Sequence, residues 1–145
     1  MMIELDPHLD DLLIKVGTKH QRHTPTTILY DHLIETWKIL KCFQCSEDVC
    51  NAGLFHSIYG TQVFKPSMIP TNNRHDVQDL IGEEAENLVF LFHITPHVRF
   101  DHFVMMSEPI RSHLITIEYA NMMEQKINWD NPNFHPYLPW TNKLN

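Results

Sequence analysis

The sequence contains little glycine and no run of alternating polar and apolar residues. Only four of its 145 residues are glycine, and the alternation that marks a half-buried β-strand does not occur. These two absences exclude a fold made mainly of β-sheet and predict an all-α fold class. Hydrophobic residues make up 43% of the chain and charged residues 20%, which is typical of a packed globular protein rather than a disordered one.

An excess of positive charge and a long apolar run are also missing. The formal net charge is −7, and binding nucleic acid requires a basic face, so nucleic acid is not an expected partner. The longest apolar run, Leu88 to Phe92, is far too short to span a bilayer. The chain does not open with a secretory signal, and its three cysteines therefore predict reduced thiols in a cytoplasmic protein. A small anionic molecule is still allowed as a partner, because a few local cations can outweigh the net charge.

Apolar residues at helical spacing predict a series of helices. We expect helices over residues 3–16, 27–41, 47–59, 76–80, 83–92 and 107–129, and a loop over 60–72. Ser46, followed by two acidic residues, is the expected N-cap of the third helix. Residues 1–130 are assigned to one helical domain. Residues 131–145, in which three prolines alternate with aromatic residues, are assigned to an irregular C-terminal tail.

Three polar residues lie where the helical pattern requires buried apolar side chains. His32, His56 and Asn121 fall on the inward stripes of three different predicted helices. A buried polar side chain costs about 1–3 kcal/mol when it has no partner, so each should be paired. The three can satisfy one another or nearby backbone. Their origin on separate helices favours a shared polar pocket, where a ligand or a metal would bind.

Four short segments carry a further pattern: residues 19–32, 52–61, 81–89 and 119–121. In this order they resemble the entry motif, the His-Asp helix, the segment after that helix and the last metal-binding step of the HD superfamily, and of its alarmone (ppGpp) hydrolase branch in particular. The resemblance covers residues 19–125. It implies an HD-like helical bundle from a divergent branch of the superfamily.

Carried over residue by residue, the resemblance implies a degenerate metal site. His32 and His56 match metal-binding histidines, whereas Ser57 and Asn121 stand where the hydrolases have carboxylates. The acidic pair that assists hydrolysis falls on residues 60 and 61, which are glycine and threonine. Hard divalent ions prefer carboxylate oxygens, so a normal HD metal centre and alarmone hydrolysis are not expected. A transition metal bound by histidine remains chemically allowed.

Two functional hypotheses follow. In the first, the pocket binds a nucleotide-like or other small anionic ligand, with or without an atypical hydrolase activity. Its candidate catalytic residues are His32, His56, Ser57 and Asn121, and its candidate metal ligands are His32 and His56. Its candidate ligand-binding residues are His20, Arg22, Tyr59, Thr61 and Arg74, because the two arginines can meet negative charge. In the second, the protein is a non-catalytic interaction protein that kept the HD-like fold and lost the chemistry. The sequence does not decide the oligomeric state.

The sulfur-containing residues offer one further metal hypothesis. Cys42, Cys45 and Cys50, followed by His56, have spacing reminiscent of a small zinc site. They span the end of one predicted helix and the start of another, so ordinary reduced cysteines are the expected outcome. The methionines near residues 105 and 122 are expected to fill the core.

Overall fold

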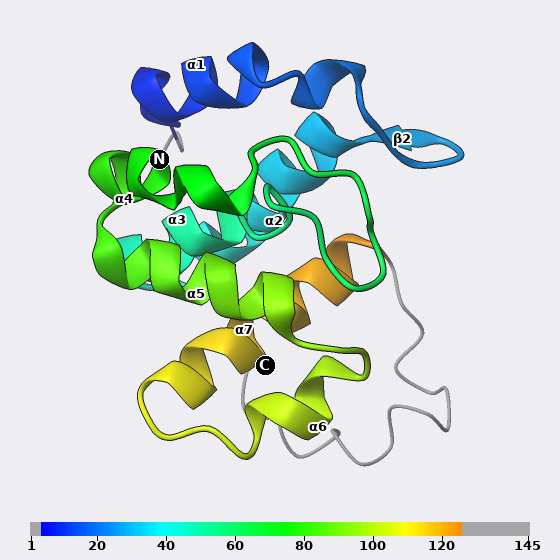
Figure 1. The fold of residues 1–145 in the computed structure, drawn as a ribbon. Coiled ribbons are helices and arrows are strands. Elements are labelled where there is room, and N and C mark those ends of the chain that lie inside the picture. Colours follow the sequence, from blue (N-terminus) through cyan, green and yellow to red (C-terminus); the bar gives the residue numbers. More distant parts are fainter. Residues whose placement is uncertain (1–3, 126–145) are drawn as a thin grey trace.

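Helices carry most of residues 4–125, the part of the chain that this computed structural model describes (Figure 1). The helices of this part are α1 (Pro7–Lys15), α2 (Leu29–Cys42), α3 (Glu47–Leu54), α4 (Arg74–Ile81), α5 (Glu83–Ile94), α6 (Arg99–Phe103) and α7 (Ile110–Glu124). Short 3-10 turns cover η1 (Thr18–His20) and η2 (Thr71–Asn73), and a two-stranded sheet joins β1 (Arg22–Thr24) to β2 (Thr27–Ile28). The predicted all-α fold class is confirmed. The tail at 131–145 lies outside the described residues.

Local signals in the sequence set most helix boundaries. Ser46 caps α3, as predicted, because its side chain accepts a hydrogen bond from the Val49 N–H (3.3 Å). Asp6 caps α1 in the same way. Gly82 adopts a φ of 90°, a left-handed conformation that favours glycine, and so separates α4 from α5. Pro109 occupies the N-cap of α7, where its missing N–H costs nothing.

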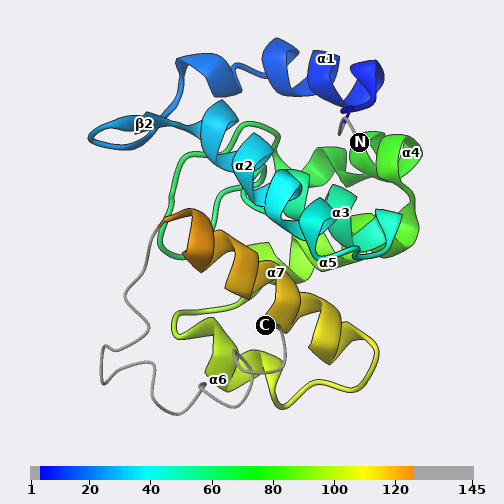
Figure 2. The ribbon, with the colours of Figure 1, turned by 180° about the vertical axis from the view of Figure 1, so that it is seen from behind.

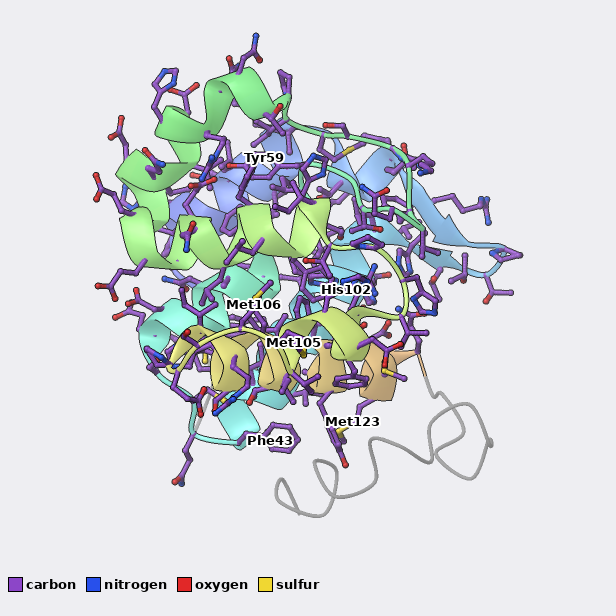
Figure 3. The ribbon with its side chains drawn as sticks, turned by 60° about the horizontal axis from the view of Figure 1, so that its bottom comes forward. Phe43, Tyr59, His102, Met105, Met106 and Met123 are labelled. Atoms are coloured by element: carbon purple, nitrogen blue, oxygen red, sulfur yellow. The ribbon has the colours of Figure 1, made fainter. Side chains whose placement is uncertain are left out.

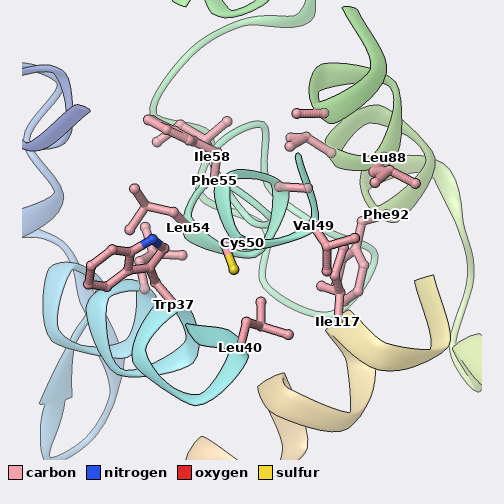
Figure 4. Close-up of a cluster of buried hydrophobic side chains, with 14 of the residues drawn as sticks. Trp37, Leu40, Val49, Cys50, Leu54, Phe55, Ile58, Leu88, Phe92 and Ile117 are labelled. Carbon is pink, nitrogen blue, oxygen red and sulfur yellow. The ribbon is translucent and has the colours of Figure 1, made fainter. Parts of the chain in front are cut away.

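The central helix of the bundle is α2, which packs against both α3 and α7. Figure 2 shows α2 and α7 side by side, whereas α1 and the hairpin lie at one end of the bundle and α6 at the other. The core between α2, α3, α5 and α7 is drawn in Figure 4 and includes Trp37, Leu40, Val49, Cys50, Leu54, Phe92 and Ile117. α2 and α3 approach closely at Gly53, where a Cβ atom would lie 2.1 Å from Leu40 Cδ1.

Three features differ from the sequence-based expectation. The β1–β2 hairpin and the five-residue α6 were not expected, because neither is long enough to produce a hydrophobic period. The third helix ends at Leu54 instead of continuing to 59, and residues 55–59 continue as turns. α7 is described as far as Glu124, so its expected end at 129 lies outside the described residues.

The methionines divide between the core and the surface. Met122 is buried, as predicted, with 7% of its surface exposed. The prediction is wrong for Met105, which follows α6 and is 83% exposed, and for Met123 on α7, which is 37% exposed (Figure 3). None of the helices within residues 4–125 is long and apolar enough to cross a membrane.

Candidate functional site

Two buried histidines meet in the middle of the bundle. His32 projects from α2 and His56 from the turn that follows α3, and their Nε2 atoms lie 3.2 Å apart. The two residues are only 1% and 2% exposed. Asn121 on α7 lines the same cavity as His56. The predicted convergence of these three residues from three segments of the chain is therefore present in the structure.

The outer nitrogen of each imidazole faces a hydrogen-bond acceptor. His56 Nδ1 lies 2.7 Å from the carbonyl oxygen of Gly53, and His32 Nδ1 contacts the Glu124 carboxylate. A carbonyl and a carboxylate only accept, so each Nδ1 carries the ring proton and each Nε2 presents a lone pair. The two lone pairs point at each other across 3.2 Å, an arrangement that a cation between them would stabilise.

The surroundings keep these imidazoles uncharged. Burial lowers the pKa of His32 to about 3, and the neighbouring His23 acts in the same direction, against a hydrogen bond with Asn121. The pKa of His56 is well below its usual value, chiefly because of burial and also because of His32. Burial also lowers the pKa of His23, whose ring stacks on that of His32 with centroids 3.9 Å apart. Both imidazoles of the pair are therefore neutral at neutral pH, the form in which an imidazole nitrogen can bind a metal ion.

A cavity of about 300 Å³ opens beside the histidine pair. Its wall is formed by the β1–β2 hairpin, the turn after α3 with the loop at 61–64, residues 97 and 99, and the end of α7. Of the predicted site residues, His56, Ser57, Thr61 and Asn121 line it. Thr61 also holds the loop in place, because its Oγ1 accepts a hydrogen bond from the Phe64 N–H (2.7 Å).

Three residues of the cavity wall carry a buried polar atom that has no hydrogen-bond partner within residues 4–125. These atoms are His23 Nδ1, Ser57 Oγ and Arg99 Nε. Buried polar atoms are nearly always paired in folded proteins. Unsatisfied atoms from three separate segments around one cavity mark it as a place where a polar ligand would gain hydrogen bonds.

A buried ion pair, Arg99 with Glu118, forms another part of the wall. Arg99 Nη1 donates to both carboxylate oxygens of Glu118, at 3.3 and 3.0 Å. Glu118 Oε1 also accepts from Asn121 Nδ2 (2.8 Å), and Asn121 Oδ1 accepts from Gln125 Nε2 (3.0 Å). Arg99 and Glu118 were not predicted as site residues. Arg99 lies in a stretch without hydrophobic periodicity, and only the inward position of Asn121, one helical turn away, hinted at Glu118.

The other four predicted ligand-binding residues do not line the cavity. His20 is exposed, and Arg22 is exposed with its Nη1 donating to a backbone carbonyl in its own hairpin (2.7 Å). Arg74 and Tyr59 both bind the fully buried carboxylate of Glu86, through Arg74 Nε and Nη2 and the Tyr59 hydroxyl, each at 2.8 Å. The two arginines that were expected to meet negative charge are therefore engaged elsewhere.

The cysteines do not form the zinc site that their spacing suggested. Cys42 is exposed and Cys50 is buried, while His56 turns toward His32. Within residues 4–125 no cluster of three or more histidine, cysteine, aspartate or glutamate side chains is arranged to hold a metal ion. Within the described residues, the histidine pair can therefore give a metal ion at most two protein ligands.

Comparison with known proteins places the chain in a family. The sequence model of a family described as a domain of unknown function (DUF6817) matches residues 12–97. The chain belongs to this family. No curated protein and no solved structure matches it significantly. The DUF6817 segment supplies the histidines and Ser57, whereas Arg99, Glu118 and Asn121 follow it in the chain. The cavity is therefore built jointly by the family segment and by the two helices after it.

Proposed function

We propose that the cavity binds a small anionic molecule, and that a divalent transition-metal ion between His32 and His56 supplies positive charge for it. The observation that carries this proposal is the 3.2 Å distance between the two Nε2 atoms, each of which bears a lone pair in the tautomers assigned above. Each imidazole is held in this orientation by the hydrogen bond of its other nitrogen. Such second bonds to carboxylates and backbone carbonyls are typical of metal-binding histidines.

The donor set favours borderline metals such as zinc, cobalt, nickel or copper. Neutral imidazoles suit these ions, whereas magnesium and calcium require oxygen ligands, most often carboxylates. Ser57 and Asn121 stand where the HD hydrolases have their carboxylates, and they offer only a hydroxyl and an amide. Two protein ligands leave several coordination positions open. An anionic ligand would occupy one of them, so metal and ligand are expected to increase each other's affinity.

The proposal is a binding function rather than alarmone hydrolysis. A hydrolase needs a base to activate water. The carboxylate in the cavity wall, Glu118, is engaged by Arg99 and Asn121. The cavity also encloses only about 300 Å³, at the low end for ligand pockets, which suits a small metabolite better than a whole nucleotide. The resemblance to the HD superfamily is retained as a proposal about ancestry.

Thermal unfolding of the full chain, purified without a metal-affinity tag, tests this function. We expect zinc chloride to raise the melting temperature of the wild type, and small anions to raise it further only when zinc is present. A ligand at one hundred times its Kd stabilises the folded state by about 2.7 kcal/mol.

The matched variants are His56→Ala and His102→Ala, since His102 is exposed on α6. The zinc-dependent shift should disappear in the first and persist in the second. If zinc shifts all three proteins equally, or none of them, the metal proposal is wrong and the interaction-protein hypothesis is favoured.

A further inference from the structure

We infer that the ligand of this cavity is a small carboxylic acid with an apolar body, and that Arg99 binds its carboxylate. The inference rests on the proposed function, because it names the ligand class of the same cavity. It shifts the recognition of negative charge from Arg22 and Arg74, which do not line the cavity, to a residue that the sequence did not single out.

Arg99 has one edge of its guanidinium group in use and one edge without a partner. Both of its hydrogen bonds within residues 4–125 leave from Nη1 and end on Glu118. Its Nε is buried and has no hydrogen-bond partner in that part of the chain. The edge that carries Nε and Nη2 presents two parallel N–H groups, a spacing that matches the two oxygens of a carboxylate. The Arg99 side chain is only 8% exposed, so such a contact would form out of bulk water.

The guanidinium is also fixed in place. Its central carbon lies 4.5 Å above the centroid of the Phe92 ring, and Glu118 holds the opposite edge. His56 packs on the same Phe92 ring, with ring centroids 5.1 Å apart. Arg99 and His56 therefore occupy neighbouring parts of the cavity wall. A group that is already oriented loses little conformational freedom when it binds, which favours affinity and specificity.

Charge and size point to a monoanion with few atoms. Glu118 already balances the charge of Arg99, so every negative charge on the ligand would be buried without a net counter-charge from this pair, and a monoanion carries the smallest such cost. The cavity of about 300 Å³ has the volume of about ten liquid water molecules, room for roughly ten non-hydrogen atoms. Val63, Phe64 and Met122 also line it, and these side chains suit an apolar body. A short aliphatic or an aromatic carboxylic acid has one negative charge, about ten non-hydrogen atoms and an apolar body, and so meets these three conditions.

The experiment compares three ligands that share one apolar body: benzoate, benzamide and phenyl phosphate. Calorimetric titration of the full chain, with and without zinc, should give the tightest binding for benzoate. In the wild type, benzoate should also shift the NMR resonance of the Arg99 Nε–H group, a change that a purely structural role of Arg99 would not produce.

The variant Arg99→Lys keeps the positive charge beside Glu118 but lacks the two parallel N–H groups that can bind a carboxylate in a bidentate way. It should weaken benzoate binding at least tenfold. Arg111→Lys is the matched control. Arg111 also pairs with a glutamate, Glu108 (3.7 Å), and its buried Nε also has no hydrogen-bond partner among the residues that the structure describes, but Arg111 does not line the cavity. This control should bind benzoate as the wild type does.

The outcomes separate this inference from the proposed function. The carboxylate inference is wrong if phenyl phosphate binds more tightly than benzoate, or if Arg99→Lys binds benzoate as tightly as the wild type does. Either result still leaves the proposal that the cavity binds a small anion. Benzoate binding that depends on Arg99 but not on zinc or His56 supports the inference and overturns the metal part of the proposed function. If none of the three compounds binds at millimolar concentration and the Arg99 resonance does not move, the inference is wrong.

Discussion

Replacing Ser57 with alanine is expected to make the unliganded protein more stable. Ser57 is 2% exposed, and its hydroxyl has no hydrogen-bond partner within residues 4–125. An unpartnered buried polar group costs about 1–3 kcal/mol, so Ser57→Ala should raise the free energy of unfolding by about 1–2 kcal/mol. For a chain of this length that corresponds to a melting temperature about 3–7 °C higher.

Thr18→Val is the matched control for this prediction. Thr18 is fully buried, and its hydroxyl donates to the carbonyl oxygen of Leu13 (2.7 Å). Removal of that hydroxyl leaves the carbonyl short of a partner, so Thr18→Val should lower the free energy of unfolding by about 1 kcal/mol. Urea unfolding followed by circular dichroism measures both variants. If Ser57→Ala destabilises the protein as Thr18→Val does, the Ser57 hydroxyl is satisfied, and the argument that unsatisfied atoms mark the cavity fails.

Two further predictions concern the scaffold around the site. Gly53→Ala should lower the free energy of unfolding by about 1 kcal/mol, because its Cβ would overlap Leu40 Cδ1. Overpacking costs about 1–3 kcal/mol, against a gain of about 1 kcal/mol in helix propensity. Calorimetry measures this, and equal or greater stability would contradict the close packing of α2 on α3. Burial acts to raise the pKa of Glu86, but hydrogen bonds from Arg74, Gln78 and Tyr59 outweigh it and hold the pKa below the usual 4.5. The contribution of the ionised Glu86 carboxylate to the free energy of unfolding is therefore complete above pH 4.5. This contribution is lost as the pH falls through the lower pKa that Glu86 has in the folded state. Glu86→Gln should flatten stability curves between pH 5 and roughly pH 2, and an unchanged slope would refute this.

The sequence predicted the helical framework because long amphipathic segments produce a strong periodic signal. The inward positions of His32, His56 and Asn121 could be found in the same way, since each interrupts an apolar stripe. The partners that the structure gives them, such as Glu124 and the carbonyl of Gly53, satisfy the expectation that buried polar groups are paired. The sequence could not show which nitrogen of each imidazole faces the other histidine, because this depends on the positions of Glu124 and of the Gly53 carbonyl in the folded chain.

The remaining part of the site could not be predicted from the sequence, because it depends on contacts between distant segments. Arg99 and Glu118 are 19 residues apart, and neither belongs to a recognisable motif. Arg74 was a reasonable candidate for anion binding by residue type. In the structure Arg74 is paired with Glu86, which is fully buried on the adjoining helix α5. The first turn of α5 contains three glutamates, and their spacing alone does not reveal which of them binds Arg74.

The histidine side-chain nitrogen spectrum of the full chain tests the central claim most directly. Long-range proton–nitrogen NMR at neutral pH reports which ring nitrogen of each histidine carries the proton. We predict that His32 and His56 are both protonated at Nδ1 and bare at Nε2, and that one equivalent of zinc shifts both Nε2 resonances together. An Nε2–H proton on either histidine, with resonances that millimolar zinc does not move, would contradict the account.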